Sequence, residues 1–147
     1  MLVSGFMIPY AQVLKCQASD TVKDALDRMM ESRVSSLVIV VDDRPTGILT
    51  KTDLCWCYQN GTSLDSLVGD IMPWTAGIKK IRGTVDRDNA AKFFEANKIH
   101  HALVVDEDDR EVGLISAMDV ATEVAKDARA WPWNRHEDGK VHSIVSH

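Results

Sequence analysis

Two eight-residue stretches of this 147-residue chain follow one pattern in the same order. Residues 47–54 are Gly-Ile-Leu-Thr-Lys-Thr-Asp-Leu, and residues 113–120 are Gly-Leu-Ile-Ser-Ala-Met-Asp-Val, 66 residues further on. Each stretch holds a glycine, two branched apolar residues, a hydroxyl side chain, two variable residues, an aspartate and a final apolar residue. A pattern that recurs at such a separation indicates a fold built from two copies of one supersecondary unit.

Each copy is predicted to consist of strand, helix, strand, strand and helix, because apolar runs of strand length alternate with segments of helical periodicity. This makes the fold class α+β, with two repeats related by a pseudo-twofold axis. The expected strands lie at residues 13–16, 37–41 and 47–50 in the first copy, and at residues 78–81, 102–105 and 112–116 in the second.

The helix after the first strand has clear sequence signals in both copies. Thr21 with Asp24 predicts a capping box at its start, and in the second copy we expect the cap near Asp88. Apolar residues at helical spacing predict the face that packs in the core. These residues are Val22, Ala25, Leu26, Met29 and Met30 in the first copy and Ala90, Phe93 and Phe94 in the second.

The repeat predicts three segments: a first repeat over residues 1–62, a second over residues 63–130 and a C-terminal tail over residues 131–147. The first residues belong to the repeat, because Val3 corresponds to Val68 and Met7 to Met72. The tail has no counterpart, and we expect its three histidines to be solvated rather than bound to metal.

Composition excludes several functions. With 45% hydrophobic and 27% charged residues the chain belongs to the ordinary globular class. A net charge of -5 without a stripe of Lys and Arg argues against a nucleic-acid partner. No apolar run is long enough to cross a membrane and no signal peptide is evident, so we expect a cytoplasmic protein without a membrane partner.

The three cysteines, Cys16, Cys55 and Cys57, are expected to be reduced thiols. The spacing of Cys55 and Cys57 points their thiols to different sides of a helix, which does not suit a metal site. Since no pair of nucleophile and base is recognisable either, we expect no catalytic residues, no metal ligands and no enzyme activity.

The repeated stretch has the residues of a ribose-phosphate site. Thr50 and Ser116 stand where a strand passes into a helix, so their hydroxyls lie beside the free N–H groups that bind phosphate at a helix N-terminus. Asp53 and Asp119, three residues on, can accept hydrogen bonds from the two hydroxyls of a ribose.

A purely structural interpretation remains open at this point. Ser/Thr-x-x-Asp is also a helix-capping signal, and Thr21 with Asp24 shows it where no ligand is suggested. Gly47 and Gly113 suit positions where a side chain would block the close approach of either backbone or ligand.

The tandem pattern resembles a pair of cystathionine-β-synthase (CBS) domains, also called a Bateman module, over about residues 1–128. The motif Gly-apolar-x-Thr/Ser-x-x-Asp of that family is matched at each fixed position in both copies. The resemblance implies a regulatory ligand, such as AMP, ADP, ATP or S-adenosylmethionine, in the cleft between the repeats. It also implies that Asp53 and Asp119 bind ribose and that Thr50 and Ser116 bind phosphate.

Further residues come from the same resemblance. The segment around His100 and His101 is similar to one in the γ subunits of AMP-activated kinase, where a His-Arg pair reaches phosphate; here His101 replaces the arginine. By position, Val13, Gly77 and Ile78 resemble segments that meet adenine.

The phosphate end of the expected sites departs from the family pattern. The arginine that often precedes the motif aspartate is replaced by Thr52 and Met118, which favours an AMP-like ligand over ATP. Lys51 is a candidate to compensate in part at the first site.

Two functions follow as hypotheses. The first is a nucleotide-sensing regulatory module that forms a homodimer through its helices and signals to an effector protein. The second is a structural or dimerisation module without a small-molecule ligand. The apolar helix residues offered for dimerisation are Met29, Met30, Phe93, Phe94 and Val124.

Overall fold

The computed structural model describes residues 1–71 and 78–130, the last four of these by their backbone alone. The chain forms two compact units. We call Ala11–Lys79 the inner unit, and Met1–Tyr10 together with the described residues from Lys80 onward the outer unit. Each unit is described by itself below.

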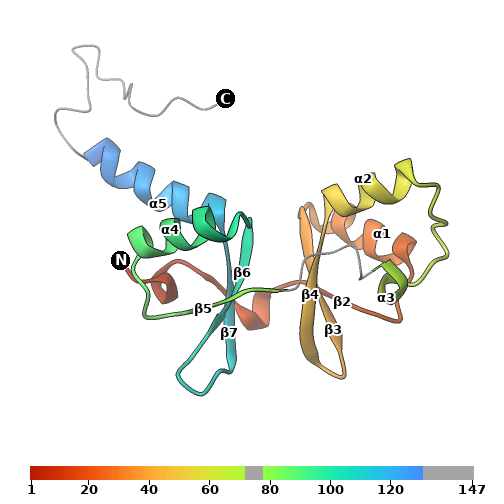
Figure 1. Cartoon of the computed structure of the whole chain (residues 1–147), viewed down its shortest axis with the longest axis horizontal. Coiled ribbons are helices and arrows are strands. Elements are labelled where there is room, and N and C mark those ends of the chain that lie inside the picture. Colours follow the sequence, from red (N-terminus) through yellow and green to blue (C-terminus); the bar gives the residue numbers. More distant parts are fainter. Residues whose placement is uncertain (72–77, 131–147) are drawn as a thin grey trace, which may run out of the picture. The chain divides into compact units, whose positions relative to one another are not determined.

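The inner unit has one three-stranded sheet in the order β2-β3-β4 (Figure 1). Its strands are β2 (Lys15–Gln17), β3 (Ser36–Val41) and β4 (Arg44–Thr50). β2 runs parallel to β3, and β3 pairs antiparallel with β4. Its described residues also form three α-helices: α1 (Val22–Ser32), α2 (Lys51–Gln59) and the short α3 (Val68–Ile71).

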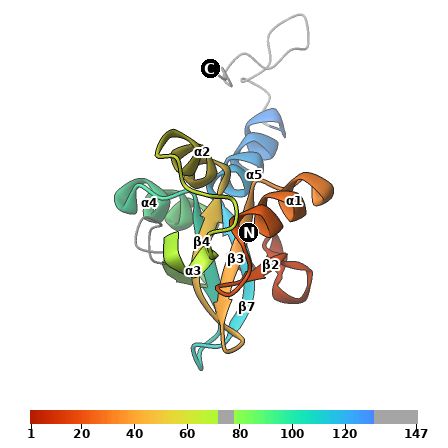
Figure 2. The ribbon, with the colours of Figure 1, turned by 90° about the vertical axis from the view of Figure 1, so that its right-hand side faces the viewer.

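The outer unit repeats this arrangement and adds one strand, in the order β1-β7-β6-β5. Its strands are β1 (Ile8–Pro9), β5 (Lys80–Arg82), β6 (His101–Val105) and β7 (Glu111–Ser116). The described helices of this unit, α4 (Arg87–Asn97) and α5 (Ala117–Ala130), pack against each other, and Figure 2 shows both in a turned view. Two 3-10 turns, η1 (Val3–Gly5) and η2 (Tyr10–Gln12), flank β1. The predicted α+β fold with two repeats is therefore confirmed.

The helices begin where the sequence predicts caps, with one shift. Thr21 and Asp24 form a complete capping box, in which the Asp24 N–H donates to Thr21 Oγ1 at 3.1 Å. In the second copy the cap is Asp86, two residues before the expected Asp88, and its carboxylate accepts from the Asn89 N–H at 2.8 Å. Asp88 instead lies in the first turn, where a carboxylate also suits the helix dipole.

The hairpin between β3 and β4 is tighter than the sequence indicates. The predicted turn covers residues 42–46, but only Asp42 and Asp43 remain outside the strands. Both adopt positive φ, 50° and 61°, which matches the twist of a two-residue hairpin turn. Aspartate tolerates this left-handed conformation better than most residues.

Each unit has its own hydrophobic core. In the inner unit α1 contributes Val22, Ala25 and Met29, which pack with residues of the sheet and of α2. In the outer unit Ala90 and Phe94 pack in the same way. Phe93 is half-buried against this second core and its ring meets Phe94 edge to face.

The prediction that Met30 belongs to the core face of α1 is wrong, because its side chain is 64% exposed. The apolar stripe is narrower than the sequence pattern indicates, and Met30 lies at its solvent edge. Met29 and Phe94 are 0% and 5% exposed, so they belong to the cores and offer no surface for dimerisation.

The two units exchange their starting segments. Residues 1–10 precede the inner unit in the chain, yet the Val3 N–H donates to Val85 O at 2.8 Å and β1 pairs with β7. Residues after 63 behave in the equivalent way, because the Val68 N–H donates to Asp20 O at 2.8 Å. The starting segments thus join the other compact unit, and the division of the sequence repeat at residue 62 stays a prediction.

None of the described helices is both long enough and apolar enough to cross a membrane. Cys16 and Cys57 are buried, Cys55 is exposed, and all three are free thiols. Cys55 and Cys57 thus lie on different sides of α2, as their spacing predicts.

Candidate functional site

The junction of β4 and α2 holds Thr50 and Asp53 in a capping box. The Thr50 N–H donates to Asp53 Oδ2 at 2.8 Å, and the Asp53 N–H donates to Thr50 Oγ1 at 3.3 Å. The Thr50 hydroxyl also donates to Asp53 Oδ2 at 3.0 Å. Both residues are half-buried, so the box is open to solvent on one side.

The junction of β7 and α5 holds Ser116 and Asp119 in the same arrangement. The Ser116 N–H donates to Asp119 Oδ2 at 2.9 Å, and the Asp119 N–H donates to Ser116 Oγ at 3.0 Å. Within the described residues, the Ser116 hydroxyl proton has no acceptor, whereas that of Thr50 is bound to Asp53. The serine hydroxyl can therefore donate to a ligand without breaking an internal bond.

Each aspartate keeps one oxygen outside the box. Among the described residues, Oδ1 of Asp53 and Oδ1 of Asp119 accept no hydrogen bond. A carboxylate oxygen beside a helix N-terminus can accept from a ligand hydroxyl. Capping and ligand binding are thus compatible, because they use different oxygens of the same side chain.

The helix ends have fewer free amides than the sequence suggests. The Lys51 N–H donates to Ser35 O at 3.1 Å, and the Ala117 N–H donates to His100 O at 2.8 Å. These bonds join the first residue of each helix to the residue before β3 or β6. No side-chain signal marks such backbone bonds, so sequence reasoning missed them. Together with the boxes, they use two of the first three amides of each helix.

The structure brings the two histidines to the outer-unit junction. His101 lies opposite Ser116 in the β6–β7 register, and His100 is exposed beside it. Burial lowers the pKa of His101 below its usual 6.5; neighbouring His100 lowers it further, and the Asp119 carboxylate opposes both effects. The imidazole of His101 is therefore neutral at pH 7 and provides hydrogen bonds but no positive charge.

The other predicted site residues are less closely gathered. Val13 is buried in the inner unit, where its carbonyl accepts from Lys15 Nζ at 2.9 Å. Ile78 is half-buried ahead of β5, and Gly77 lies outside the described residues. Lys51 lines a pocket between α1 and α2, a different surface from the Thr50–Asp53 box. No hydrogen bond within the described part of the chain joins Val13 or Ile78 to either box.

The close approach of the N-terminal strand β1 explains why residue 113 is a glycine. A Cβ at this position would lie 2.7 Å from Ile8 O and 2.5 Å from Met7 Sδ, both too close for a carbon atom. The glycine therefore permits the close approach of β1 to β7. The sequence left open whether backbone or a ligand approaches this glycine. In the described structure it is the backbone of β1 that approaches Gly113.

The two junctions present polar groups that can bind a ligand. No group of three or more His, Cys, Asp or Glu in the described residues is arranged to hold a metal ion. What the junctions present are hydroxyls, carboxylate oxygens, amides and neutral imidazole, which are groups that recognise polyhydroxyl and phosphate moieties.

Comparisons with known proteins agree on the type of fold. The family model "CBS domain" matches residues 3–58 and 68–126. An inosine-5'-monophosphate dehydrogenase of Thermoplasma acidophilum is 31% identical over 94 residues, which are 64% of this chain and 18% of that protein. The match thus spans less than a fifth of the dehydrogenase.

Similar solved structures include CBSX2 of Arabidopsis thaliana in complex with AMP, with a TM-score of 0.71 and 23% identity over 86% of this chain and 97% of the other. The CBS domain of a bacterial CNNM/CorC family Mg²⁺ transporter in complex with ATP has a TM-score of 0.74 and 24% identity, covering 85% and 87%. The CBS pair of MJ0100, in a complex with S-adenosyl-L-methionine, has a TM-score of 0.73 and 16% identity, covering 86% and 98%. At these identities the likeness shows the fold.

Proposed function

Because this chain belongs to the CBS domain family, we propose that it is a regulatory module whose capped strand–helix junctions bind an adenosine-containing ligand. The outer-unit junction is the stronger site. The observation that carries this proposal is the unused binding capacity there: Asp119 Oδ1 and the Ser116 hydroxyl proton are both free of partners in the described structure. CBS structures with AMP, ATP and S-adenosyl-L-methionine support the ligand class.

In the proposed complex Asp119 accepts hydrogen bonds from the ribose hydroxyls, and Ser116 donates to phosphate. The amide of Met118, the second residue of α5, adds a donor at the positive end of the helix dipole. Thr50 and Asp53 take the same roles in the inner unit, at the cost of the internal bond between the Thr50 hydroxyl and Asp53. We assign the adenine contacts to Val13, Gly77 and Ile78.

The proposed ligand is AMP-like. A neutral His101 donates or accepts a hydrogen bond but does not balance several phosphate charges. Asp119 lies close enough to His101 to influence its titration, so the junction already carries a negative charge. A polyphosphate would meet this carboxylate, and Met118 stands where the family pattern often has an arginine to offset it. ADP and ATP are therefore expected to bind more weakly than AMP.

Isothermal calorimetry on ligand-stripped protein tests the proposal. Titration with AMP, ADP, ATP and S-adenosylmethionine should give saturable heat with at least AMP, and affinity should fall from AMP to ATP. No heat with any of the four would reject the proposal for this ligand class. Mass spectrometry of small molecules that remain bound through native purification would identify the ligand independently.

We also propose that the module forms a homodimer and that an effector protein responds to its ligand state. Of the five helix residues that the sequence offers for dimerisation, Met30 and Val124 are exposed, at 64% and 41%. Light scattering at micromolar concentration should give twice the mass of the chain, and Met30→Glu with Val124→Glu should restore the monomeric mass. A monomeric mass for the unmodified protein would contradict the dimer.

The capping boxes themselves favour a second function, that of a structural module without ligand. In that case Asp53 and Asp119 serve only to start α2 and α5, and their replacement by alanine lowers thermal stability equally with and without nucleotide. A cap of this kind contributes about 1 kcal/mol. Thermal unfolding of both variants, with and without AMP, separates the two functions.

A further inference from the structure

The second copy has two histidines beside its strand–helix junction where the first copy has two serines. His100 and His101 correspond to Ser35 and Ser36. The strand registers agree with this correspondence, because Ser36 lies opposite the capping residue of α2 and His101 lies opposite the capping residue of α5. The two junctions therefore share their capping boxes and differ in the side chains beside them.

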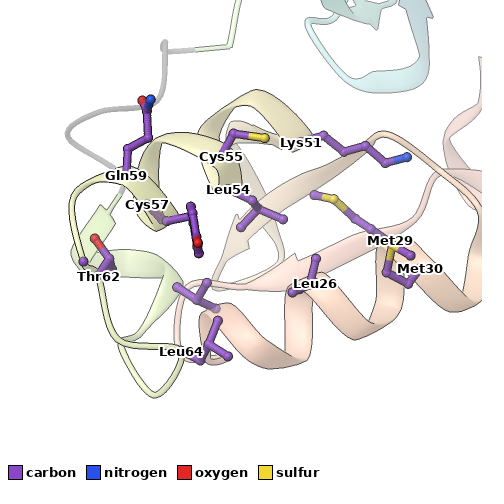
Figure 3. Close-up of a pocket in the computed structure, with 13 residues that line it drawn as sticks. Leu26, Met29, Met30, Lys51, Leu54, Cys55, Cys57, Gln59, Thr62 and Leu64 are labelled. Carbon is purple, nitrogen blue, oxygen red and sulfur yellow. The ribbon is translucent and has the colours of Figure 1, made fainter.

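Permanent positive charge is distributed in the opposite way. Lys51, the first residue of α2, belongs to the inner unit and lines the face between α1 and α2 (Figure 3). Its counterpart at the start of α5 is Ala117, which is followed by Met118. Among the described residues of the outer-unit junction, 100–101 and 116–119, only the two histidines can become positively charged.

Strand alternation places the His101 side chain beside the Ser116 hydroxyl. Ala102 and Val104 of β6 pack in the outer-unit core, so His101 lies on the other face of the sheet. Residues directly opposite each other in an antiparallel pair have Cβ atoms about 4.5–5.5 Å apart on one face. His101 and Ser116 are such a pair. The imidazole is therefore a neighbour of the hydroxyl to which we assign the phosphate.

A backbone hydrogen bond joins the start of the same strand to the helix. The Ala117 N–H donates to His100 O at 2.8 Å, which holds the first turn of α5 against the residue before β6. The His100 side chain is exposed, whereas His101 is half-buried. Because this bond uses the backbone of His100, replacement of either imidazole leaves it in place.

Two titratable groups act on His101 from its own segment and from α5. Burial lowers the pKa of His101, a charge on His100 lowers it further, and the Asp119 carboxylate raises it. Glu123, one turn further along α5, pairs with a lysine of the same helix at 3.1 Å, and its carbonyl accepts from Arg87 of α4 at 3.3 Å. The remainder of α4 packs on the core face of the sheet, away from His101.

The charged residues of the neighbouring strands are held at the other end of the sheet. Lys80 of β5 pairs with Asp109 at 3.2 Å, and Arg82 donates to Asp106 O at 2.8 Å, both at the β6–β7 hairpin. Glu111 begins β7 at this hairpin, far along the strand from Ser116. The charged residues in the segments leading to β5 and β6 are Lys79 and Lys98, both exposed.

We propose that His101 makes phosphate binding at the outer-unit junction depend on pH, because its imidazole takes up a proton when a nucleotide phosphate binds. This inference rests on the proposed nucleotide function and adds a regulation of the same site. An imidazolium beside the Ser116 hydroxyl gives phosphate a charge-assisted contact that Ala117 and Met118 cannot provide.

The sign of the effect follows from linkage. The free protein holds His101 neutral at pH 7, because its pKa is lowered. A bound phosphate dianion favours the imidazolium and raises the pKa of His101 in the complex. Between these two pKa values the complex carries a proton that the free protein lacks. As pH falls through this window, affinity for the nucleotide should rise by up to about tenfold per pH unit.

Calorimetry with AMP from about pH 5 to pH 8, the range in which histidine titrates, tests the proposal. A phosphate monoester itself loses a proton near about pH 6, so each pH is compared between two proteins and the titration of the ligand cancels. The affinity of the unmodified protein relative to His101→Gln should rise about tenfold from the alkaline to the acid end.

His100→Gln is the matched control. It removes an exposed imidazole next in the chain and should retain the rise in affinity at acid pH. The rise should move to higher pH, because His100 no longer opposes a charge on His101. Adenosine, which has no phosphate, should bind the unmodified protein and His101→Gln equally at every pH. Thermal circular dichroism establishes that both variants are folded.

Adenosine 5′-sulfate provides a measurement that needs no variant, because its anionic group does not titrate in this range. Its affinity for the unmodified protein should rise as pH falls, and binding should take up protons in buffers of different ionisation enthalpy. A constant affinity without proton uptake would overturn the proposal even if His101→Gln failed to fold.

The remaining outcomes separate this inference from the proposed function. An AMP affinity ratio that is constant with pH would overturn the role of His101 and leave nucleotide binding in place. The same rise with adenosine would also overturn it, because the proton would then act without phosphate. Loss of the rise in His100→Gln alone would reject the assignment to His101. No saturable heat with AMP at any pH would reject the proposed function and this inference together.

Discussion

Asp119→Ala should weaken nucleotide binding by about 2–4 kcal/mol, equivalent to a loss of affinity of roughly 30- to 1,000-fold. The proposed complex has two ribose hydroxyls that donate to this carboxylate, and charge-assisted bonds of this kind are the strong ones. Calorimetry with AMP measures the change. Asp53→Ala should reduce the affinity for AMP less. The Thr50 hydroxyl already donates to Asp53, so a ligand at the inner-unit junction must first break this internal hydrogen bond and is expected to bind more weakly there.

A third capping box in the chain supplies a matched control for this experiment. Asp24 closes a box with Thr21 at the start of α1, with the same i,i+3 geometry and no proposed ligand. Asp24→Ala should cost about 1 kcal/mol of stability and leave nucleotide affinity unchanged. If Asp24→Ala and Asp119→Ala reduced affinity equally, the loss would reflect helix fraying, and the assignment of Asp119 to ribose would be rejected.

Gly113→Ala should destabilise the outer unit by about 2–3 kcal/mol, because the new methyl group overlaps backbone that cannot move without separating β1 from β7. The closest backbone atom is Ile8 O, 2.7 Å from the added carbon. The corresponding fall in melting temperature is roughly 6–12 °C for a chain of this size. Differential scanning calorimetry or thermal circular dichroism would measure it.

Gly5→Ala is the comparison for that substitution. Its added carbon would lie 3.2 Å from Met1 Cγ, an atom of a flexible side chain, and should change stability by less than about 0.5 kcal/mol. Equal melting temperatures for the two variants would contradict the pairing of β1 with β7. A selective loss at Gly113 would show that the first ten residues are structural parts of the outer unit.

Local sequence patterns predicted most of the elements because their causes are local. A capping box needs residues three apart, so Thr50 with Asp53 and Ser116 with Asp119 were recognisable without tertiary information. The apolar run at residues 37–41 predicted a buried strand, and Leu37, Ile39 and their neighbours in β3 are indeed buried. Errors of one or two residues, as at the Asp86 cap, fall where several polar residues compete for one role.

Burial at the edge of a helix face was harder to predict. Met29 and Met30 are both compatible with helical periodicity, yet one is in the core and the other is solvent-exposed. The decision depends on how far the sheet extends beneath α1, which is a property of the packed unit. The same limit applied to Phe93 and Phe94, of which only the second is fully buried.

The sequence by itself determined the duplication, the order of elements in each copy, the capped junctions and, through the family they resemble, the class of ligand to test. Tertiary structure decided which unit each starting segment joins, which oxygens and hydroxyls remain available at the junctions, and where α1 and α2 leave a pocket. These features depend on contacts between residues far apart in the chain, such as Val3 with Val85 and Arg87 with Glu123. Such pairings have no short-range spacing, so no pattern of neighbouring residues can specify them.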